Sequence, residues 1–474
     1  MKNTCKYLIG NEWRESKDIL EVMNPYNNEI VGATFLASER DIEDAIQGAL
    51  HAFGETRKLP AFKRAEILGN IRDSISKRSE EFARTITLES GKPIADARVE
   101  VERAIGTFQI ASEESRRMFG EVIPLDITER SKNRVGIHRR FPIGPILGIS
   151  PFNFPLNLIV HKVAPALASG NPIIIKPASK TPLTALLLGE VIAESGWPAG
   201  GFSIFPCKLT LAERMVTDDR IKMLTFTGSA EIGWQLKQLA GKKRVTLELG
   251  GNAGAIIDSP ENLDYIVKRC VVSAFSFSGQ ICISLQRLFL NKKICDDFMT
   301  NFIDNIKTLK MGNPMDEDTR IGPMIDEQSA QKIESWVNDA IKEGAILACG
   351  GKRNGALYEP TVITHTTPGM KINKNELFAP AVTVSTHENF EDAVKQINNS
   401  RYGLQASVFT NNIRHIFYAY ENLEVGGVIV NDVPSFRADT MPYGGTKDSG
   451  IGREGVRYAM EEMTEPKLLV LNLS

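Results

Sequence analysis

The feature that most constrains the fold is a regular alternation of short apolar runs and amphipathic segments that begins at Ile143. Ile146 to Ile149 and Met223 to Phe226 have the length and apolar character of buried strands, whereas Pro155 to Ser169 has the length of a helix. Strands that alternate with helices at this spacing predict a parallel sheet covered by helices on both faces. A second series of strands and helices follows Cys282, so we expect an α/β protein with a second α/β unit.

The part of the chain before this alternation predicts helices and one extended arm. Ser38 to Ala52 resembles a capped helix, with Ser38 ahead of Asp41, and helical periodicity continues from Phe62 to Leu88. Val122 to Arg140 is polar and alternating, which predicts an extended ribbon. Such an arm often pairs with a partner subunit, and a surface hairpin is the alternative.

Composition excludes several classes of function. A net charge of −2 gives no reason to expect a nucleic acid or an anionic membrane as partner. The six Cys and six His are dispersed, without a CxxC or HExxH pattern, so no metal site is expected. Free thiols indicate a reducing compartment. The N-terminus is polar and no apolar run reaches membrane-spanning length, so we expect a cytoplasmic protein.

Two side chains in Gly-rich or turn-like segments, Glu248 and Cys282, could carry chemistry together. Cys is well suited to attack a carbonyl carbon at neutral pH, because its thiolate is intrinsically nucleophilic. A nearby Glu can take a proton from the thiol or from a later water. Each residue alone is more simply explained as a loop Glu and a buried Cys, since Cys is among the most buried residue types.

Segments after the predicted strands have the form of a nucleotide site. Thr225 to Ser229 is a strand followed by a Gly turn and a helix start, where free N–H groups can bind phosphate, although a plain turn is the simpler interpretation. Lys176 can bond a ribose, and the short Ser179 leaves room for a 2′-phosphate that a carboxylate would repel. A solvated loop Lys is the alternative for this segment.

The stretch from Ser150 to Lys162 carries polar residues in an otherwise apolar segment. Asn153 could donate its amide to a developing oxyanion or could cap the following helix. Asn157 and His161 lie four residues apart, so one face of the helix has a polar stripe. The stripe either lines a wet tunnel or satisfies buried partners, and we favour the tunnel.

Seven motifs occur in the order found in the NAD(P)-dependent aldehyde dehydrogenase superfamily, and the chain resembles that superfamily over nearly its whole length. They are Phe152 to Pro155, Lys176 to Ser179, Phe226 to Ser229, Glu248 to Gly251, Gly279 to Cys282, Glu376 to Pro380 and the loop from Pro442 to Arg453. Val99 to Phe108 and Asn431 to Asp439 look most like the lactaldehyde dehydrogenase and non-phosphorylating glyceraldehyde-3-phosphate dehydrogenase branch.

The resemblance implies a fold and a mechanism. It implies a Rossmann-type cofactor domain (residues 1–121 and 141–248), an α/β catalytic domain (249–445), and oligomerisation or bridging segments (122–140 and 446–474). Cys282 would form a thiohemiacetal whose oxyanion rests on Asn153 and the Cys282 N–H. Hydride transfer to the nicotinamide would leave a thioester, which water activated by Glu248 would hydrolyse. Lys162 would assist proton traffic.

The resemblance also implies which residues contact NADP or NAD. Lys176 and Ser179 would hold the adenosine ribose, Ser229 the pyrophosphate and Glu376 the nicotinamide ribose, with Phe378 packing nearby. The complete expected set is Ile149, Ser150, Pro151, Phe152, Lys176, Ser179, Phe226, Gly228, Ser229, Ile232, Leu249, Gly250, Glu376 and Phe378. Because Ser179 replaces a frequent Glu, NADP should be accepted.

The substrate is expected to be a small polar aldehyde, with lactaldehyde as the leading candidate. Succinate semialdehyde and glyceraldehyde 3-phosphate are alternatives, although Ile281 stands where several phosphate-handling relatives carry Arg. The expected substrate contacts are Arg103, Asn157, His161 and Arg437, and either Arg could instead belong to a structural ion pair. The expected assembly is a homodimer or homotetramer.

Two other classes of protein are compatible with parts of the pattern. A CoA-acylating dehydrogenase would also use Cys282, but the intact motif around Glu248 favours water as the final acceptor. A structural protein of the same fold would not need Cys282, Glu248 and Asn153 together.

Overall fold

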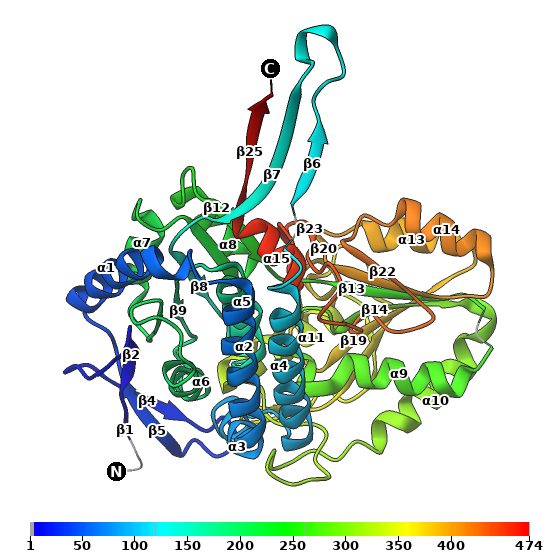
Figure 1. The fold of residues 1–474 in the computed structure, drawn as a ribbon. Coiled ribbons are helices and arrows are strands. Elements are labelled where there is room, and N and C mark those ends of the chain that lie inside the picture. Colours follow the sequence, from blue (N-terminus) through cyan, green and yellow to red (C-terminus); the bar gives the residue numbers. More distant parts are fainter. Residues whose placement is uncertain (1–3, 119, 260, 474) are drawn as a thin grey trace.

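The computed structural model describes residues 4–118, 120–259 and 261–473 and contains two sheets of mostly parallel strands (Figure 1). The larger sheet has eight strands. In spatial order these are β24 (Gly450–Ile451), β12 (Arg244–Glu248), β11 (Met223–Thr227), β8 (Ile146–Ile149), β9 (Ile173–Lys176), β10 (Phe202–Ile204), β2 (Tyr7–Ile9) and β3 (Glu12–Arg14). The five strands from β12 to β10 run parallel, as the alternation of strands and helices predicts.

Helices from the first half of the chain pack around this sheet, and their apolar faces build the largest core cluster. They are α1 (Glu39–Thr56), α2 (Ala61–Lys77), α3 (Ser79–Ser90), α4 (Ile94–Glu114), α5 (Asn157–Ser169), α6 (Leu183–Ala193), α7 (Leu209–Thr217) and α8 (Ala230–Leu239). The helical periodicity predicted from Phe62 to Leu88 belongs to two helices, since α2 ends before Arg78 and α3 begins after it. The helix α7 was not predicted from the sequence.

The smaller sheet has seven strands and forms the second α/β unit. In spatial order these are β15 (Ile346–Cys349), β18 (Thr361–Thr364), β19 (Ala381–His387), β14 (Leu285–Asn291), β13 (Ala253–Ile257), β21 (Gln405–Phe409) and β22 (Gly427–Val430). The helices that accompany it are α9 (Leu263–Phe275), α10 (Cys295–Lys307), α11 (Glu327–Lys342), α12 (Lys371–Lys374), α13 (Phe390–Asn398) and α14 (Ile413–Asn422). The predicted α/β fold is therefore confirmed.

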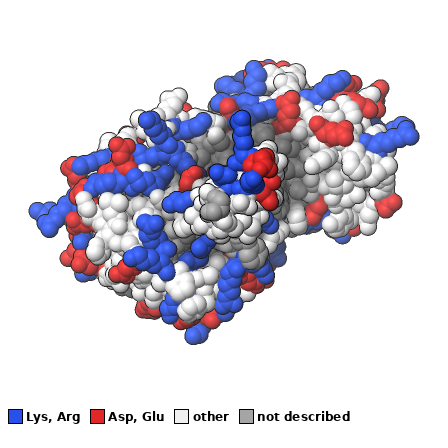
Figure 2. All heavy atoms as spheres, turned by 45° about the horizontal axis from the view of Figure 1, so that its top comes forward, with Lys and Arg blue, Asp and Glu red and all other residues white. Residues whose placement is uncertain are grey.

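The predicted ribbon is part of a three-stranded arm that projects from the top of the molecule (Figure 1). Its strands are β6 (Glu121–Pro124), β7 (Arg134–Pro142) and the C-terminal β25 (Thr464–Asn472), which follows α15 (Val456–Glu462) and pairs antiparallel with β7. Figure 2 turns this side of the molecule forward and shows Lys and Arg side chains interspersed with Asp and Glu. No helix in the described ranges is long and apolar enough to cross a membrane.

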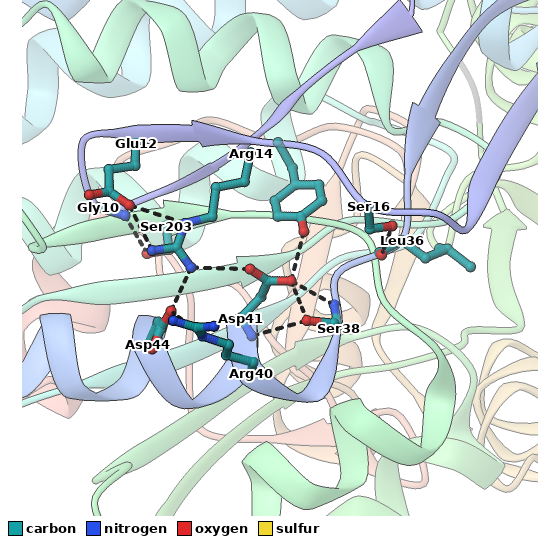
Figure 3. A network of polar contacts seen from close by, with 11 residues as sticks. Gly10, Glu12, Arg14, Ser16, Leu36, Ser38, Arg40, Asp41, Asp44 and Ser203 are labelled. Carbon is teal, nitrogen blue, oxygen red and sulfur yellow. Dashed lines mark hydrogen bonds and ion pairs between the residues drawn. The ribbon is translucent and has the colours of Figure 1, made fainter.

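A polar network fixes the N-terminal strands to α1 (Figure 3). The Ser38 hydroxyl accepts from the Asp41 N–H, and Asp41 Oδ2 accepts from the Ser38 N–H at 2.9 Å, which completes a capping box. Arg14 on β3 donates to Asp41 at 3.1 Å and to Asp44 at 2.6 Å. The hydroxyl of Tyr7 on β2 also donates to Asp41, at 2.7 Å. The predicted cap of Ser38 and Asp41 therefore binds the hairpin of β2 and β3 to the N-terminus of α1.

Three further small sheets complete the described structure. They are β1 (Thr4–Cys5) with β5 (Ile30–Phe35) and β4 (Ile19–Met23), β16 (Arg353–Asn354) with β17 (Leu357–Tyr358), and β20 (Tyr402–Gly403) with β23 (Thr446–Lys447). The exact domain boundaries given above stay a prediction.

Candidate active site

Four adjacent parallel strands of the larger sheet end at the same level. Glu248 pairs with Thr227, and Phe226 pairs with Ile149, which in turn pairs with Lys176. The chain runs outward from β8 to β9 and β10 and then returns to β11 and β12 on the other side of β8. Ligands of open α/β sheets bind at such a reversal point, outside the carboxyl ends of the strands. The residues predicted to bind the coenzyme that follow these strands therefore share one edge: Ile149, Ser150, Pro151, Phe152, Lys176, Ser179, Phe226, Gly228, Ser229, Ile232, Leu249 and Gly250.

Several groups at this edge fit the phosphate and ribose of a dinucleotide. Ser229 caps α8 by accepting from the Ile232 N–H at 3.4 Å, and the N-terminus of α8 faces the same edge. The Ser150 hydroxyl is buried and has no hydrogen-bond partner among the described residues. Lys176 is partly buried, which lowers the pKa of its ammonium, and Ser179 is exposed. A ligand at this edge would give the Ser150 hydroxyl a partner.

Glu376 reaches this edge from the second α/β unit. Its carboxylate accepts from the Gly251 N–H at 3.0 Å, and a side chain on Gly250 would collide with it. Burial raises the pKa of Glu376 to about 7, although the bond from Gly251 opposes the rise. Phe378 packs edge-on against Phe152 with ring centroids 6.0 Å apart. Glu376 and Phe378 therefore lie against the motifs that follow β12 and β8.

The chain crosses from the larger to the smaller sheet between Glu248 and Ala253, at the predicted Gly-rich turn. A side chain on Gly251 would collide with the carbonyl oxygen of Cys282. The backbones of the Glu248 and Cys282 segments therefore touch, which only a residue without Cβ permits. The two residues that the sequence singled out are brought together in this way.

Cys282 follows a strained turn. In the 3-10 segment η2 (Ser276–Gly279), Phe277 has φ 47° and Ser278 has φ 53°. Left-handed conformations at non-glycine residues cost roughly 1–3 kcal/mol each and are found often at functional sites. The Ser278 hydroxyl donates to the Gly322 carbonyl at 2.7 Å, and Gln280 Oε1 accepts from the Ile325 N–H at 2.8 Å. These bonds hold the turn that presents the thiol.

The thiol faces a cavity of about 280 Å³. Cys282, Asn153, Asn157, Arg103 and Arg437 all line it. His161, which we predicted to contact substrate, is not among the described residues that line the cavity. Its Nε2 lies 3.1 Å from Asp439, and burial lowers the pKa of its imidazole. Neither ring nitrogen of His161 has a hydrogen-bond partner among the described residues by geometry, so its contact with substrate stays a prediction.

Asn153 does not cap the helix that follows it. The helix α5 begins at Asn157, two residues later than predicted, and the N–H groups of Leu156 and Asn157 donate to Glu100 on α4. The Asn153 amide donates to the Gln280 carbonyl at 2.9 Å. Because an amide nitrogen carries two N–H groups, one remains for another acceptor.

Lys162 belongs to a buried charge cluster that the sequence analysis did not foresee. Its ammonium lies 2.6 Å from the Thr227 hydroxyl and 3.2 Å from Glu454, and Glu454 also accepts from Arg437 at 3.0 Å. Burial would raise the pKa of Glu454, but Lys162 and Arg437 outweigh it and lower that pKa to about 2. Glu454 is therefore ionised. Its one sequence signal was its position next to the Gly-rich loop ending at Arg453.

Glu248 lies beside this cluster without sharing its partners. Neither carboxylate oxygen has a hydrogen-bond partner among the described residues. Burial, and then repulsion from Glu454, raises the pKa of Glu248 well above its ordinary value. A buried carboxyl group whose pKa is raised in this way has the properties of a general acid or base.

Three more residues around the cavity were missed by the sequence analysis. Asp439 accepts from Arg103 at 2.7 Å. Tyr443 lies with its hydroxyl 3.0 Å from the Cys282 sulfur. The buried Lys92 ammonium is 3.7 Å from the ring centroid of Phe154. Asp439 and Tyr443 stood in segments quoted for the resemblance but were given no role, because the partners of these residues lie far away in the sequence.

Comparisons with known proteins agree with this geometry. The chain matches the Aldehyde dehydrogenase family over residues 13–469. A 3-sulfolactaldehyde dehydrogenase of Priestia aryabhattai is 39% identical over 466 residues, which are 98% of this chain and 97% of the relative. A lactaldehyde dehydrogenase of Methanococcus aeolicus is 40% identical over 469 residues, which are 98% of this chain and 99% of the relative.

Solved structures give the same result. Aldehyde dehydrogenase 21 from Physcomitrella patens, in complex with the reaction product succinate, is 46% identical with a TM-score of 0.98 and covers 100% of this chain and 99% of its own. The glyceraldehyde-3-phosphate dehydrogenase GapN from Methanocaldococcus jannaschii, complexed with NADP, is 38% identical with a TM-score of 0.91. It covers 97% of this chain and 99% of its own. These matches confirm the resemblance drawn from the seven motifs, and the chain is an NAD(P)-dependent enzyme that belongs to the aldehyde dehydrogenase family.

Proposed function

We propose that this enzyme oxidises a short aldehyde that carries an anionic group to the corresponding acid. The observation that carries the proposal is that Arg103 and Arg437 line the same cavity as Cys282. A volume of about 280 Å³ is at the small end for a ligand pocket, which favours a substrate of few atoms. Guanidinium groups bind carboxylates and related oxyanions with geometry that ammonium groups lack.

The bonding of the two arginines leaves donors for such an anion. Arg437 Nε is buried and has no hydrogen-bond acceptor among the described residues, and Asp439 lies 3.8 Å from it. Arg103 is partly exposed in its pair with Asp439. One relative is named for 3-sulfolactaldehyde, and another was solved with succinate. These small molecules carry a sulfonate and carboxylates on short chains, which supports an anionic aldehyde as the substrate.

The proposed mechanism gives each residue near the cavity a role. Cys282 forms a carbon–sulfur bond to the carbonyl carbon, and the second N–H of Asn153 and the Cys282 N–H stabilise the oxyanion. A bound nicotinamide coenzyme supplies the hydride acceptor. Glu248 takes a proton from the water that attacks the resulting thioester, which releases the acid and the thiol. Lys162 moves protons within the buried cluster.

The coenzyme contacts are part of the proposal. Lys176 and Ser179 would hold the adenosine ribose, and the absence of a carboxylate at 179 leaves space for the 2′-phosphate of NADP. Ser229 and the N-terminus of α8 would hold the pyrophosphate. Glu376 would hold the nicotinamide ribose.

Lactaldehyde is the second candidate substrate. Asn157 lines the cavity, and its Oδ1 is buried without a hydrogen-bond partner among the described residues, so it can accept from a substrate hydroxyl. The relative from Methanococcus aeolicus is named for lactaldehyde.

Initial rates with succinate semialdehyde, lactaldehyde, glycolaldehyde, glyceraldehyde 3-phosphate and propanal, each with NAD and NADP, test the proposal. Arg437→Met and Arg103→Met should raise KM for succinate semialdehyde about 10- to 100-fold, because each removes one charge-assisted contact. The same changes should alter KM for propanal by less than about threefold. Equal rises in KM for succinate semialdehyde and propanal would contradict an anion-binding role and leave lactaldehyde as the better candidate.

We also propose a cytoplasmic homo-oligomer, either a dimer or a tetramer. All six Cys are free, which suits a reducing compartment. The arm strand β25 exposes Leu468 to Leu471 on both of its faces, which favours burial against a partner subunit.

A further inference from the structure

The thiol of Cys282 has a buried hydroxyl group as its neighbour. Tyr443 Oη lies 3.0 Å from Cys282 Sγ and supplies the one side-chain hydrogen bond that the sulfur makes to the described residues. Tyr443 is 3% exposed and lines the same cavity. A phenol at this distance from a sulfur atom can donate to it whenever the sulfur becomes a thiolate.

The backbone fixes the position of Tyr443. The Tyr443 N–H donates to the Glu454 carbonyl at 3.0 Å, and the Glu454 N–H donates back to the Tyr443 carbonyl at 2.7 Å. This two-sided bridge joins the ends of the Gly-rich loop near the C-terminus. The hydroxyl is therefore held against the thiol by a closed loop.

A guanidinium group lies over the face of the Tyr443 ring. The carbon at the centre of the Arg437 guanidinium is 3.8 Å from the ring centroid, and the same guanidinium donates to Glu454 at 3.0 Å. A cation over the ring is attracted by its π electrons and favours negative charge on the phenol oxygen. Burial is the largest influence on Tyr443 and raises the pKa of its phenol well above the ordinary value, and Arg437 opposes this rise.

We propose that Tyr443 is a catalytic residue that donates its hydroxyl hydrogen bond to the sulfur of Cys282 and stabilises the thiolate before it attacks the aldehyde. The thiol proton leaves to water, Tyr443 keeps its own proton, and the sulfur lone pair then forms the bond to the carbonyl carbon. The hydrogen bond from Tyr443 to the sulfur weakens as the negative charge of the thiolate moves to the aldehyde oxygen.

The surroundings of the thiol make such a donor necessary. Burial is the largest influence and raises the pKa of Cys282 to about 12, whereas the Tyr443 hydroxyl opposes this rise. Glu376 and Glu248 also disfavour the thiolate, and Arg437 favours it. The other charged groups that line the cavity are Lys92, Asp96, Glu100 and Arg103. A hydrogen bond from Tyr443 offsets part of the cost of a buried anion without adding a charge.

The test is the pH dependence of Cys282 alkylation by iodoacetamide, followed by mass spectrometry of the peptide that contains this residue. Only the thiolate reacts, so the rate reports its population and needs neither aldehyde nor coenzyme. The readout is therefore independent of which substrate the enzyme uses. Cys282→Ser gives the background from the other five thiols.

Tyr443→Phe removes the hydroxyl and keeps the ring beneath Arg437. We expect the apparent pKa of the thiol to rise by about one unit, which lowers the alkylation rate at neutral pH about tenfold. Turnover should fall by a similar factor. Tyr420→Phe, which changes an exposed residue on α14, should leave the alkylation profile unchanged.

An unchanged alkylation profile in folded Tyr443→Phe would falsify the proposal and leave Tyr443 as a wall of the cavity. If this variant does not fold, 3-fluorotyrosine at position 443 tests the same bond, since its more acidic phenol is a stronger donor. The apparent thiol pKa should then fall, and a thiol that titrates as in the unmodified enzyme would overturn the role of the hydroxyl.

Discussion

At the scale of single residues, two buried carboxyl groups near the cavity differ in charge because their partners differ. Glu454 is ionised between Lys162 and Arg437, whereas Glu248 has no hydrogen-bond partner among the described residues and is repelled by Glu454. Because the two groups interact, their titration belongs to the pair. A carboxyl group with a raised pKa becomes a base only as the pH rises through that pKa. The rate of thioester hydrolysis should therefore increase with pH through the raised pKa of Glu248.

Glu248→Gln should leave the first turnover intact and slow every later one. Glutamine cannot take a proton from water, so the steady-state rate should fall about 100-fold or more after a burst of coenzyme reduction. Stopped-flow absorbance of the reduced coenzyme measures both phases. Cys282→Ala should remove the burst as well, while Glu66→Gln, an exposed change on α2, should alter neither phase. An undiminished steady-state rate in Glu248→Gln would remove it as the hydrolytic base.

Ser179→Glu should discriminate between the two coenzymes. A carboxylate at this exposed position beside Lys176 would repel the 2′-phosphate of NADP and could accept from the 2′-hydroxyl of NAD. We expect KM for NADP to rise about 100-fold, equivalent to roughly 2.7 kcal/mol, with little change for NAD. Ser179→Gln, which matches Glu in size but carries no charge, is the control and should not discriminate between the coenzymes. Equal effects on the two coenzymes would mean that the adenosine ribose lies elsewhere.

At the scale of elements, the stability of α1 depends on one carboxylate that three neighbours share (Figure 3). Burial alone would raise the pKa of Asp41, but bonds from Ser38, Tyr7 and Arg14 outweigh it and lower that pKa. The stabilisation is therefore fully present above the unfolded value of about 3.8 and is lost as the pH falls through the lower, folded value.

Asp41→Asn should lower the thermal midpoint at pH 7 by about 2–4 °C, because it removes the charge that Arg14 and the cap share. Thermal scans at matched rates measure the shift. In acid the difference between the native protein and the variant should shrink, since Asp41 is then protonated in both states. Asp304→Asn, in an exposed pair with Lys307, is the control and should shift the midpoint by less than about 1 °C. A pH-independent difference would contradict the charge argument.

The sequence predicted what local patterns determine and missed what only packing creates. Glu248 and Cys282 stood in recognisable turns, and the strands on either side of them followed from apolar runs of the right length. The pair of Lys162 with Glu454 joins positions 292 residues apart, and that of Arg103 with Asp439 joins positions 336 apart. No periodicity links such positions, so the ionic surroundings of the site became visible only in the folded chain.

At the scale of the whole molecule, the arm carries an apolar strand that the described chain does not cover. On β25, Leu468 is 49% and Leu469 is 54% exposed, and successive residues of a strand point to opposite faces. Exposed apolar side chains on both faces of an edge strand favour association with a second copy.

Leu469→Lys should therefore shift the enzyme to a smaller species in analytical ultracentrifugation. Phe417→Lys makes the same change at an exposed position on α14 and should leave the assembly intact. Because Cys282 and Tyr443 come from one chain, the smaller species should keep its thiol reactivity. An unchanged sedimentation coefficient in Leu469→Lys would mean that the arm does not hold the subunits together.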